Sequence, residues 1–346
     1  MVDGAALRKV EEHWGSPVAA QWRTEKRLHW TEHPRVQERL NFLVSGDPRK
    51  DRFQYFIDKY YRSRRPDKYV QRALTLGCGH GEFERGLSQY RFAKTHEGID
   101  IAEGAIVEAR RLAEGSGLRH LNYRIADLNT VQLPRNAYDV VFGVSSIHHV
   151  MCLEHLFAQI AKSLRPGGFF FLDEYIGPNK FQWTDAQLTF INAQIAALPT
   201  RLKRSIIDQS VKGKVGRMPI ADIDAVDPSE AIRSADILNV LRLNFDIVEI
   251  KGCGGSLLHM LLEGIAGNFA EDDPEATGCL ESMFRTEDEL ITAGKLQHDF
   301  AVIIARKKPT RAQRLVGCRI AYLVSGLRAS LEETRTAMAQ SQTRRS

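Results

Sequence analysis

Short apolar runs alternate with longer amphipathic stretches through the middle of the chain, starting at about residue 71. Runs of this length are typical of strands buried on both faces, and the stretches between them have the length and periodicity of helices. The alternation predicts a doubly wound, mostly parallel sheet of the α/β class. The predicted strands are ALTLG (73–77), EGID (97–100), NYRIA (122–126), YDVVFGV (138–144) and GFFFLDEY (168–175), and the helices between them are predicted at 82–90, 102–115 and 153–164.

The pattern changes after residue 175. Residues 183–240 look mostly helical, and a strand, FDIVEI, is predicted at 245–250. A second helical stretch at about 257–294 precedes a last strand, DFAVIIARK, at 299–307. Long connections with helices of their own are usually lids or interaction elements.

Both ends of the chain differ from the middle in charge. The net charge of +5 divides into +5 over 1–70, −5 over 71–308 and +5 over 309–346. Residues 1–70 are expected to form a helical N-terminal segment, and the amphipathic stretch at 314–335 a basic C-terminal helix. We expect that helix to pack on the protein or to form a homodimer, with peripheral contact to an anionic membrane as the alternative.

Composition narrows the class of protein. With 43% apolar and 26% charged residues, the chain is neither disordered nor fibrous. Its five cysteines show no CxxC spacing, so neither a disulfide framework nor a zinc ribbon is expected, and no metal site is predicted. No apolar stretch reaches the roughly 20 residues of a membrane span, and the charged start does not look like a signal peptide. We therefore expect a reduced, cytoplasmic protein.

The segment LTLGCGHGEFERGL carries the strongest chemical signal. A predicted strand leads into Gly77, Gly79 and Gly81, where the backbone can turn sharply and approach a ligand closely. Dinucleotide-binding loops favour GxGxxG, whereas this loop reads GxGxG and continues into Glu82 and Glu84. Carboxylates at that helix start disfavour a pyrophosphate and suit a ligand with an ammonium group, such as S-adenosylmethionine (SAM).

Two acids follow the next two predicted strands. Asp100 ends EGID and can accept hydrogen bonds from two ribose hydroxyls, while Asp127 in RIADLN can accept from an adenine amino group. Either residue alone could instead cap a helix or stabilise a turn. Because the carboxyl ends of parallel strands meet at one sheet edge, we expect both acids to face the same ligand as the glycine loop.

Taken together, these segments resemble a class I SAM-dependent methyltransferase. LTLGCGHG matches the family's first motif, Asp100 its ribose acid and Asp127 its adenine-side acid, while DVVFGVSSIHHV and LRPGG match the fourth strand with its loop and the turn before the fifth strand. The resemblance implies SAM as the cofactor and a sheet of seven strands, the seventh antiparallel between the fifth and the sixth. It implies cofactor contacts from Leu76, Gly77, Cys78, Gly79, Gly81, Asp100, Ile101, Asp127, Leu128, Val144 and Ser145.

The predicted domain therefore spans residues 71–308. It departs from the family by two helical lid insertions, at about 177–243 and 252–298. The first lies where the family builds its substrate pocket, and the second replaces a connection that is often a short hairpin.

Methyl transfer to a hydroxyl group needs a base near the carboxyl ends of the fourth and fifth strands. His149 and Glu174 are the first candidates, followed by His148. The histidines could instead pack near the cofactor, and Glu174 could bind a substrate hydroxyl or cap the next helix. An amine or carboxylate acceptor would need no base.

Aromatic residues in the first insertion are candidates for binding the acceptor. Tyr175, Phe181 and Trp183 can stack on a ring or sugar, and they can equally anchor the lid as hydrophobic side chains. His259 on an apolar helix is a fourth candidate, with a packing role as the alternative.

The sequence thus predicts a SAM-dependent methyltransferase that acts on a small-molecule or a glycan- or lipid-linked acceptor, at oxygen. Two alternatives are a non-catalytic SAM-binding or assembly protein on the same scaffold and a methyltransferase acting on nucleic acid. The position after the fourth strand reads GVSS, which disfavours an enzyme acting on the amino group of a base.

Overall fold

A computed structural model describes residues 9, 25, 29–63 and 69–308. The chain divides into two units, 1–307 and 308–346, and only the first is described here. The helix predicted at 314–335, with the subunit or membrane contact expected of it, lies outside the described residues.

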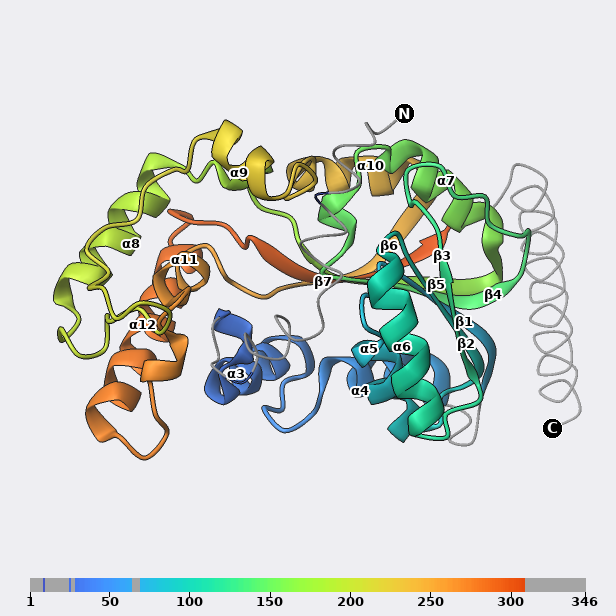
Figure 1. The fold of residues 1–346 in the computed structure, drawn as a ribbon, viewed down its shortest axis with the longest axis horizontal. Helices are drawn as coiled ribbons and strands as arrows, with labels where there is room; N and C mark the ends of the chain where they lie inside the picture. The colour runs from blue at the N-terminus through green and yellow to red at the C-terminus, as the bar shows by residue number, and fades with distance from the viewer. Residues whose placement is uncertain (1–8, 10–24, 26–28, 64–68, 309–346) are drawn as a thin grey trace, which may run out of the picture. The chain divides into compact units, whose positions relative to one another are not determined.

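A seven-stranded sheet in the order β3-β2-β1-β4-β5-β7-β6 forms the centre of the first unit (Figure 1). The first five strands pair in parallel, and β7 is antiparallel to both of its neighbours. The sheet is therefore mixed, with the inserted antiparallel strand that the resemblance implies. The strands are β1 (Val70–Leu76), β2 (Ala93–Asp100), β3 (Leu121–Ile125), β4 (Tyr138–Val144), β5 (Leu164–Tyr175), β6 (Phe245–Gly252) and β7 (Phe300–Lys307).

Helices cover both faces of the sheet because alternate residues of each strand point to opposite sides. In β5, Phe169 and Phe171 join a buried cluster with α3, α4, α8 and α12, whereas Phe170 and Leu172 join a second cluster with α7 and α10. The α-helices are α3 (Pro34–Ser45), α4 (Arg52–Ile57), α5 (Glu82–Leu87), α6 (Glu103–Gly115), α7 (Leu153–Ser163), α8 (Asp185–Ala197), α9 (Ile220–Val226), α10 (Ile237–Asn244), α11 (Leu258–Leu262) and α12 (Pro274–Thr292).

The two insertions are less helical than their sequences predict. Residues 198–219 form an irregular segment with one isolated β-bridge between Arg204 and Val211, although they were expected to be helical. Pro199 and Pro219 bound this segment, and prolines interrupt helices because they lack an N–H group and clash with the preceding turn. In the second insertion, only α11 and α12 are α-helical.

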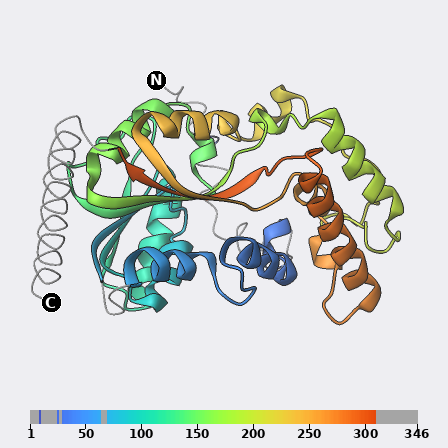
Figure 2. The same cartoon turned by 180° about the vertical axis from the view of Figure 1, so that it is seen from behind.

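The helices of the two insertions come together although they are far apart in the sequence. Figures 1 and 2 show α8, α11 and α12 as one group on one side of the sheet. α11 packs against both α8 and α12. The two predicted lids are therefore one structural element.

The described part of the N-terminal segment packs on the sheet. Phe56 of α4 is fully buried against Phe142, Phe169 and Phe171. Beside it, Arg52 forms a salt bridge with Asp173 of β5 at 2.9 Å. The segment is thus part of the same core as the sheet.

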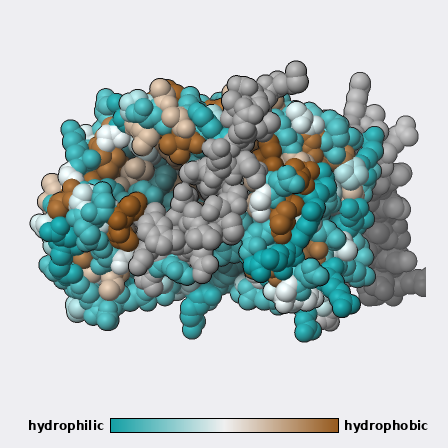
Figure 3. Space-filling view, in the orientation of Figure 1, coloured by the Kyte–Doolittle hydropathy of each residue, from teal (hydrophilic) through white to brown (hydrophobic). Residues whose placement is uncertain are grey.

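The surface carries its apolar residues in separate small groups between polar ones, as Figure 3 shows for one face. Several of the exposed apolar side chains belong to the first insertion, among them Ile207, Met218 and Val226. Within the described residues, every helix is too short or too polar to cross a bilayer.

Candidate functional site

The carboxyl ends of the parallel strands lie side by side at one edge of the sheet. Leu76, the last residue of β1, pairs with Ile99 of β2 and Gly143 of β4. Asp100, at the end of β2, pairs with Ile125 at the end of β3. The loops after these strands therefore meet in one place, which is where open parallel sheets bind their ligands.

The glycine loop needs its glycines for two different reasons. Gly77, Gly79 and Gly81 have φ angles of 63°, 49° and 74°, a region that side chains disfavour. A Cβ atom at Gly77 would lie 2.5 Å from Cβ of Ser146, and one at Gly81 would lie 2.5 Å from Oη of Tyr123. At Gly79 no such neighbour lies within 4 Å, so this part of the loop borders open space.

Asp100 joins the end of β2 to the glycine loop. Its Oδ2 accepts a hydrogen bond from the backbone N–H of Gly79 at 2.8 Å, and its Oδ1 accepts one from Ala102 at 2.9 Å. Burial raises the pKa of Asp100, and these two N–H groups counteract part of the rise. Each carboxylate oxygen has a second lone pair, so Asp100 can still accept hydrogen bonds from two hydroxyl groups.

Asp127 follows β3, whose end is tied to β2 by a 2.8 Å hydrogen bond from Ala126 N–H to the carbonyl of Asp100. Oδ1 of Asp127 accepts from the backbone and side-chain nitrogens of Asn129, at 2.8 and 3.0 Å. The carboxylate therefore stabilises its own turn, one of the alternatives that the sequence left open. A bond to adenine stays a prediction.

The remaining residues predicted to contact the cofactor surround these two acids and the loop. Leu76 and Cys78 are buried at the base of the loop, and the backbone of Ser145 has a positive φ of 47°. Ile101, Leu128 and Val144 are half-buried beside the strand ends, and their contact with a cofactor also stays a prediction.

The two glutamates at the start of α5 lie in different environments. Glu82 is exposed, whereas Glu84 is fully buried, and neither carboxyl oxygen of Glu84 has a hydrogen-bond partner within the described residues. Burial raises the pKa of Glu84 to about 7. The argument that both carboxylates repel a pyrophosphate therefore holds only for Glu82.

Glu84→Gln is expected to remove a pH-dependent loss of stability. The pKa of Glu84 is about 7 in the folded protein and near 4.5 in the unfolded chain. Its contribution to the free energy of unfolding is therefore complete below pH 4.5 and is lost as the pH rises through 7, where the buried carboxyl group ionises. The shift corresponds to roughly 3 kcal/mol. Urea unfolding measures the free energy of unfolding at pH 5 and at pH 8, and the difference between the two values should be smaller in Glu84→Gln than in the unaltered protein. Glu82→Gln, at an exposed carboxylate, is the control and should leave this difference unchanged.

The glycine loop and its surroundings fit SAM. The open space at Gly79 would accept a ligand close to the backbone, and the carboxylate of Asp100 can accept from vicinal hydroxyls. Nε2 of His80, inside the loop, is buried without a hydrogen-bond partner among the described residues, so it can receive a polar group of the ligand.

Glu174, at the end of β5, is surrounded by hydrogen-bond donors. Its Oε1 accepts from the backbone N–H groups of Ser146 and Ile147, and its Oε2 accepts from Tyr175 N–H at 3.1 Å. Nδ1 of His148 lies 2.6 Å from the same Oε2. A carboxylate with four donors and no exposed surface holds the loop after β4 in place and has little capacity left to accept a proton from a substrate.

His148 lies between two carboxylates. Besides Glu174 on Nδ1, Oε1 of Glu230 lies 3.5 Å from its Nε2. Burial lowers the pKa of His148, but Glu174 and then Glu230 outweigh this effect and raise the pKa to about 9. The ring is therefore a cation near neutral pH and a poor base.

His149 has a different set of partners. Ser229 donates its hydroxyl hydrogen to Oδ1 of Asp227 at 2.6 Å, so its oxygen can accept from Nδ1–H of His149 at 3.0 Å. This arrangement leaves the lone pair of the ring on Nε2, which lies 4.0 Å from Oε2 of Glu230. His149 thus has the tautomer and the flanking carboxylates that a general base requires.

The four residues predicted to bind the acceptor lie together. With two further rings they form an aromatic box around His259. Measured between ring centroids, His259 is 5.3 Å from Phe300, 5.5 Å from Phe181, 6.1 Å from Tyr175, 6.2 Å from Trp183 and 6.4 Å from Trp30. Tyr175 also lies 6.1 Å from the ring of His148, which joins the aromatic box to the charged cluster.

The segment that carries Phe181 is fixed by contacts with the rest of the first insertion. Lys180 and Phe181 both have positive φ angles, 52° and 50°, which non-glycine residues rarely adopt. Nζ of Lys180 is fixed by Asp224 and by the carbonyl of Pro228, both at 2.7 Å. These contacts compensate for the strain and set the position of the Phe181 ring, which stacks on Trp183.

Buried polar atoms of this region lack partners. Nε1 of Trp30, Oγ of Ser256 and Nδ1 of His259 are buried and make no hydrogen bond to any described residue. Buried polar atoms are normally hydrogen-bonded, so a water, an ion or a polar ligand is expected beside them. A separate surface hollow of about 610 Å³ is lined by other residues, among them Ile206, Gln209 and Asn268, and shares none with the strand ends.

Several of these groups were missed by the sequence analysis. Asp227, Ser229 and Glu230 follow no motif, and Trp30 lies in the N-terminal segment, far from the sheet in sequence. An unusual density of acids beside Ser229 in DAVDPSE was the only available signal.

The sheet order, the glycine loop and the acids at the strand ends define a class I SAM-dependent methyltransferase domain. Residues 74–172 match the family described as a methyltransferase domain, which confirms the resemblance drawn from the motifs.

Curated relatives share this part of the chain. A sterol 24-C-methyltransferase of Aspergillus fumigatus is 30% identical over 110 residues, which are 32% of this chain and 29% of the relative. A fatty-acid O-methyltransferase of Mycolicibacterium smegmatis is 29% identical over 118 residues, 34% of this chain and 42% of the relative. The chain therefore spans less than half the length of these relatives. Among solved structures, phosphoethanolamine N-methyltransferase 2 of Haemonchus contortus with bound SAM has 17% identity and a TM-score of 0.43, with 80% of this chain and 57% of that chain covered.

Proposed function

We propose that the protein transfers a methyl group from SAM to a hydroxyl or carboxyl oxygen of a largely apolar small molecule or lipid-linked acceptor. The observation that carries this proposal is the meeting of three parts at one sheet edge: the glycine loop with Asp100, the charged cluster around His149, and the aromatic box. A fatty-acid O-methyltransferase and a 27-O-demethylrifamycin SV methyltransferase among the relatives support an acceptor of this kind.

SAM supplies an electrophilic methyl group whose leaving group is a neutral thioether. The chain's contribution is to bind and orient. Gly79 and the loop backbone would hold the cofactor closely, Asp100 would accept from its ribose hydroxyls, and Asp127 would lie on its adenine side.

The aromatic box would bind the apolar part of the acceptor. Phe181 and Trp183 offer stacked faces, and Nε1 of Trp30 can donate a hydrogen bond to an acceptor oxygen. Closely packed rings also exclude water from the reaction.

His149 would accept the proton of an acceptor hydroxyl at Nε2. Ser229, itself held by Asp227, orients the ring through Nδ1, and Glu230 stabilises the imidazolium that forms. His148 and Glu174 hold the loop that carries His149 and take no proton from the acceptor. In this interpretation His149 is the catalytic residue of the three predicted from the sequence.

The test is turnover of SAM with a panel of fatty acids, phenols and hydroxylated polyketides, followed by a variant. His149→Gln is expected to lower kcat by about 100-fold and to leave the Kd of SAM unchanged, because general bases contribute factors of this size. His155→Gln is the control, because the ring of His155 lies 3.0 Å from the carbonyl oxygen of Val131 and belongs to none of the three parts of the site. If the purified protein does not bind SAM at near-millimolar concentration, the proposal fails.

Cytoplasmic location remains part of this proposal. It rests on the cysteines, since Cys78, Cys152, Cys253 and Cys279 are all unpaired thiols in the structure.

A further inference from the structure

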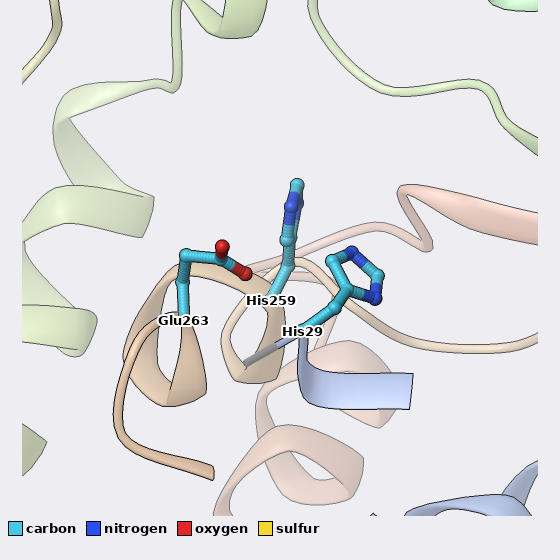
Figure 4. Close-up of side chains that lie close together, drawn as sticks. All are labelled: His29, His259 and Glu263. Atoms are coloured by element: carbon cyan, nitrogen blue, oxygen red, sulfur yellow. The ribbon is translucent and has the colours of Figure 1, made fainter. Parts of the chain in front are cut away.

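His29, His259 and Glu263 bring three metal-binding side chains together at the aromatic box. One ligand atom from each lies within 4.8 Å of those of the other two. Figure 4 shows the His259 ring and the Glu263 carboxylate on the same side of α11, with the His29 ring beside them. We call these three residues the His–His–Glu triad.

Local structure places two of the ligands. His259 lies in α11 and Glu263 follows its last residue, so the two are four residues apart and project from one face of the helix. Nζ of Lys212 fixes this end of the helix by donating to the carbonyls of Met260 and Glu263, both at 2.6 Å. The spacing and the anchored backbone hold both side chains ready for one ion.

The third ligand comes from the N-terminal segment. Nδ1 of His29 lies 2.7 Å from Oγ1 of Thr31, and the backbone N–H of His29 donates to Oε2 of Glu32 at 3.0 Å. These bonds fix the orientation of the ring, and Nδ1 also lies 3.4 Å from the backbone nitrogen of Thr31. In the tautomer in which Nδ1–H donates to Oγ1 of Thr31, the lone pair of the ring is on Nε2, which would be the ligating atom. Metal-binding histidines in proteins are typically oriented by such a bond to their other nitrogen.

His259 is the residue that most clearly lacks a partner. Only 7% of the residue is exposed, and its Nδ1 has no hydrogen-bond partner among the described residues. A bound cation would satisfy this nitrogen.

We propose that the His–His–Glu triad binds a divalent first-row transition metal ion, Zn²⁺ in the first place. Two imidazoles and one carboxylate suit Zn²⁺ and leave a coordination position open. That position would face the rings of the aromatic box and could take an oxygen of the acceptor. Only this last point rests on the proposed function; binding of the metal does not.

A second group of possible ligands exists in His148, His149 and Glu230, whose ligand atoms also lie within 4.8 Å of one another. There the positive His148 ring already lies between Glu174 and Glu230. A metal ion at this position would replace the proton of His148 and would break the contacts of this ring with the two carboxylates.

The experiment is calorimetric titration of chelator-stripped, full-length protein with Zn²⁺, repeated with Co²⁺ while its visible absorption is recorded. We expect one equivalent to bind, and we expect Glu263→Gln and His259→Phe to weaken binding at least 100-fold. Glu230→Gln, which removes the carboxylate of the other group, should leave Zn²⁺ binding unchanged. Zn²⁺ should also raise the Tm of the unaltered protein and not that of Glu263→Gln.

Loss of Zn²⁺ binding in Glu230→Gln, unchanged binding in Glu263→Gln, or no binding by the unaltered protein would each overturn the metal site. SAM titration of the same samples separates this result from the proposed function. Normal SAM binding and methyl transfer without any Zn²⁺ binding would refute the metal site alone.

Discussion

Asp100→Ala is expected to weaken the binding of SAM and of S-adenosylhomocysteine by about 100-fold, measured by calorimetry. The variant loses the acceptor for two ribose hydroxyls and also frees the N–H of Gly79, which the carboxylate holds in the loop. Charge-assisted hydrogen bonds contribute roughly 1.5–3 kcal/mol each, and about 3 kcal/mol in total corresponds to this factor.

Asp100→Asn keeps one acceptor oxygen, so its affinity for SAM should lie between that of the unaltered protein and that of Asp100→Ala. Glu114→Gln, at an exposed acid on the neighbouring helix α6, is the matched control. Equal losses for SAM and S-adenosylhomocysteine are expected, because the two share the ribose. An unchanged Kd in a folded Asp100→Ala protein would remove this residue from the cofactor site.

Glu174→Ala is expected to lower the free energy of unfolding by about 3–5 kcal/mol. The substitution leaves the buried N–H groups of Ser146 and Ile147 without their acceptor and the His148 cation without its nearest counter-charge. Removing one partner of a buried ion pair costs about 3–5 kcal/mol, because the other charge stays buried without compensation. Urea unfolding at pH 7 measures the loss.

The same variant should change how stability depends on pH. The pKa of His148 is about 9 when folded and near 6.5 when unfolded, so its contribution is full below pH 6.5 and is lost as the pH rises through 9. Without Glu174, this decrease in stability between pH 6.5 and pH 9 should largely disappear. Glu174→Gln keeps an acceptor for the backbone N–H groups and loses the charge. It should therefore be more stable than Glu174→Ala and lack the decrease in stability between pH 6.5 and pH 9. A Glu174→Ala protein that unfolds like the unaltered one would contradict the role assigned here.

The strands and the glycine loop could be predicted because their determinants are local. A buried parallel strand is a short apolar run, and a glycine at a positive φ is needed wherever the loop turns, so LTLGCGHG and EGID carry their own structural information. Strand order and the antiparallel β7 came from the resemblance, since the pattern of apolar runs contains no pairing information.

The acid–base cluster could be predicted only in part. His148, His149 and Glu174 stand at strand ends and were found, but the sequence could not show that Glu174 is fully engaged by backbone donors. Glu230 reaches the histidines from an irregular insertion. Side chains brought together by tertiary packing leave no periodic trace in the sequence.

The inserted helices were overpredicted for a related reason. Residues 198–219 were predicted as part of a mostly helical stretch, yet prolines at both ends interrupt a helix and the backbone between them is irregular. That Tyr175, Phe181 and Trp183 lie close together could be anticipated, because Phe181 and Trp183 are two residues apart in one segment and Tyr175 directly ends a strand. Their contact with an acceptor stays a prediction.

The position of β7 between β5 and β6 also shapes how the chain folds as it is made. One side of β5, with its run of three phenylalanines, can pair only with a strand that begins at Phe300. At about 5–20 residues per second, the ribosome needs roughly 6–25 s to make the residues between them. During that time an apolar strand edge is open to other chains, a known hazard for aggregation. The second insertion lengthens this interval, so the segment that contributes Glu263 to the His–His–Glu triad also prolongs the exposure of that edge during synthesis.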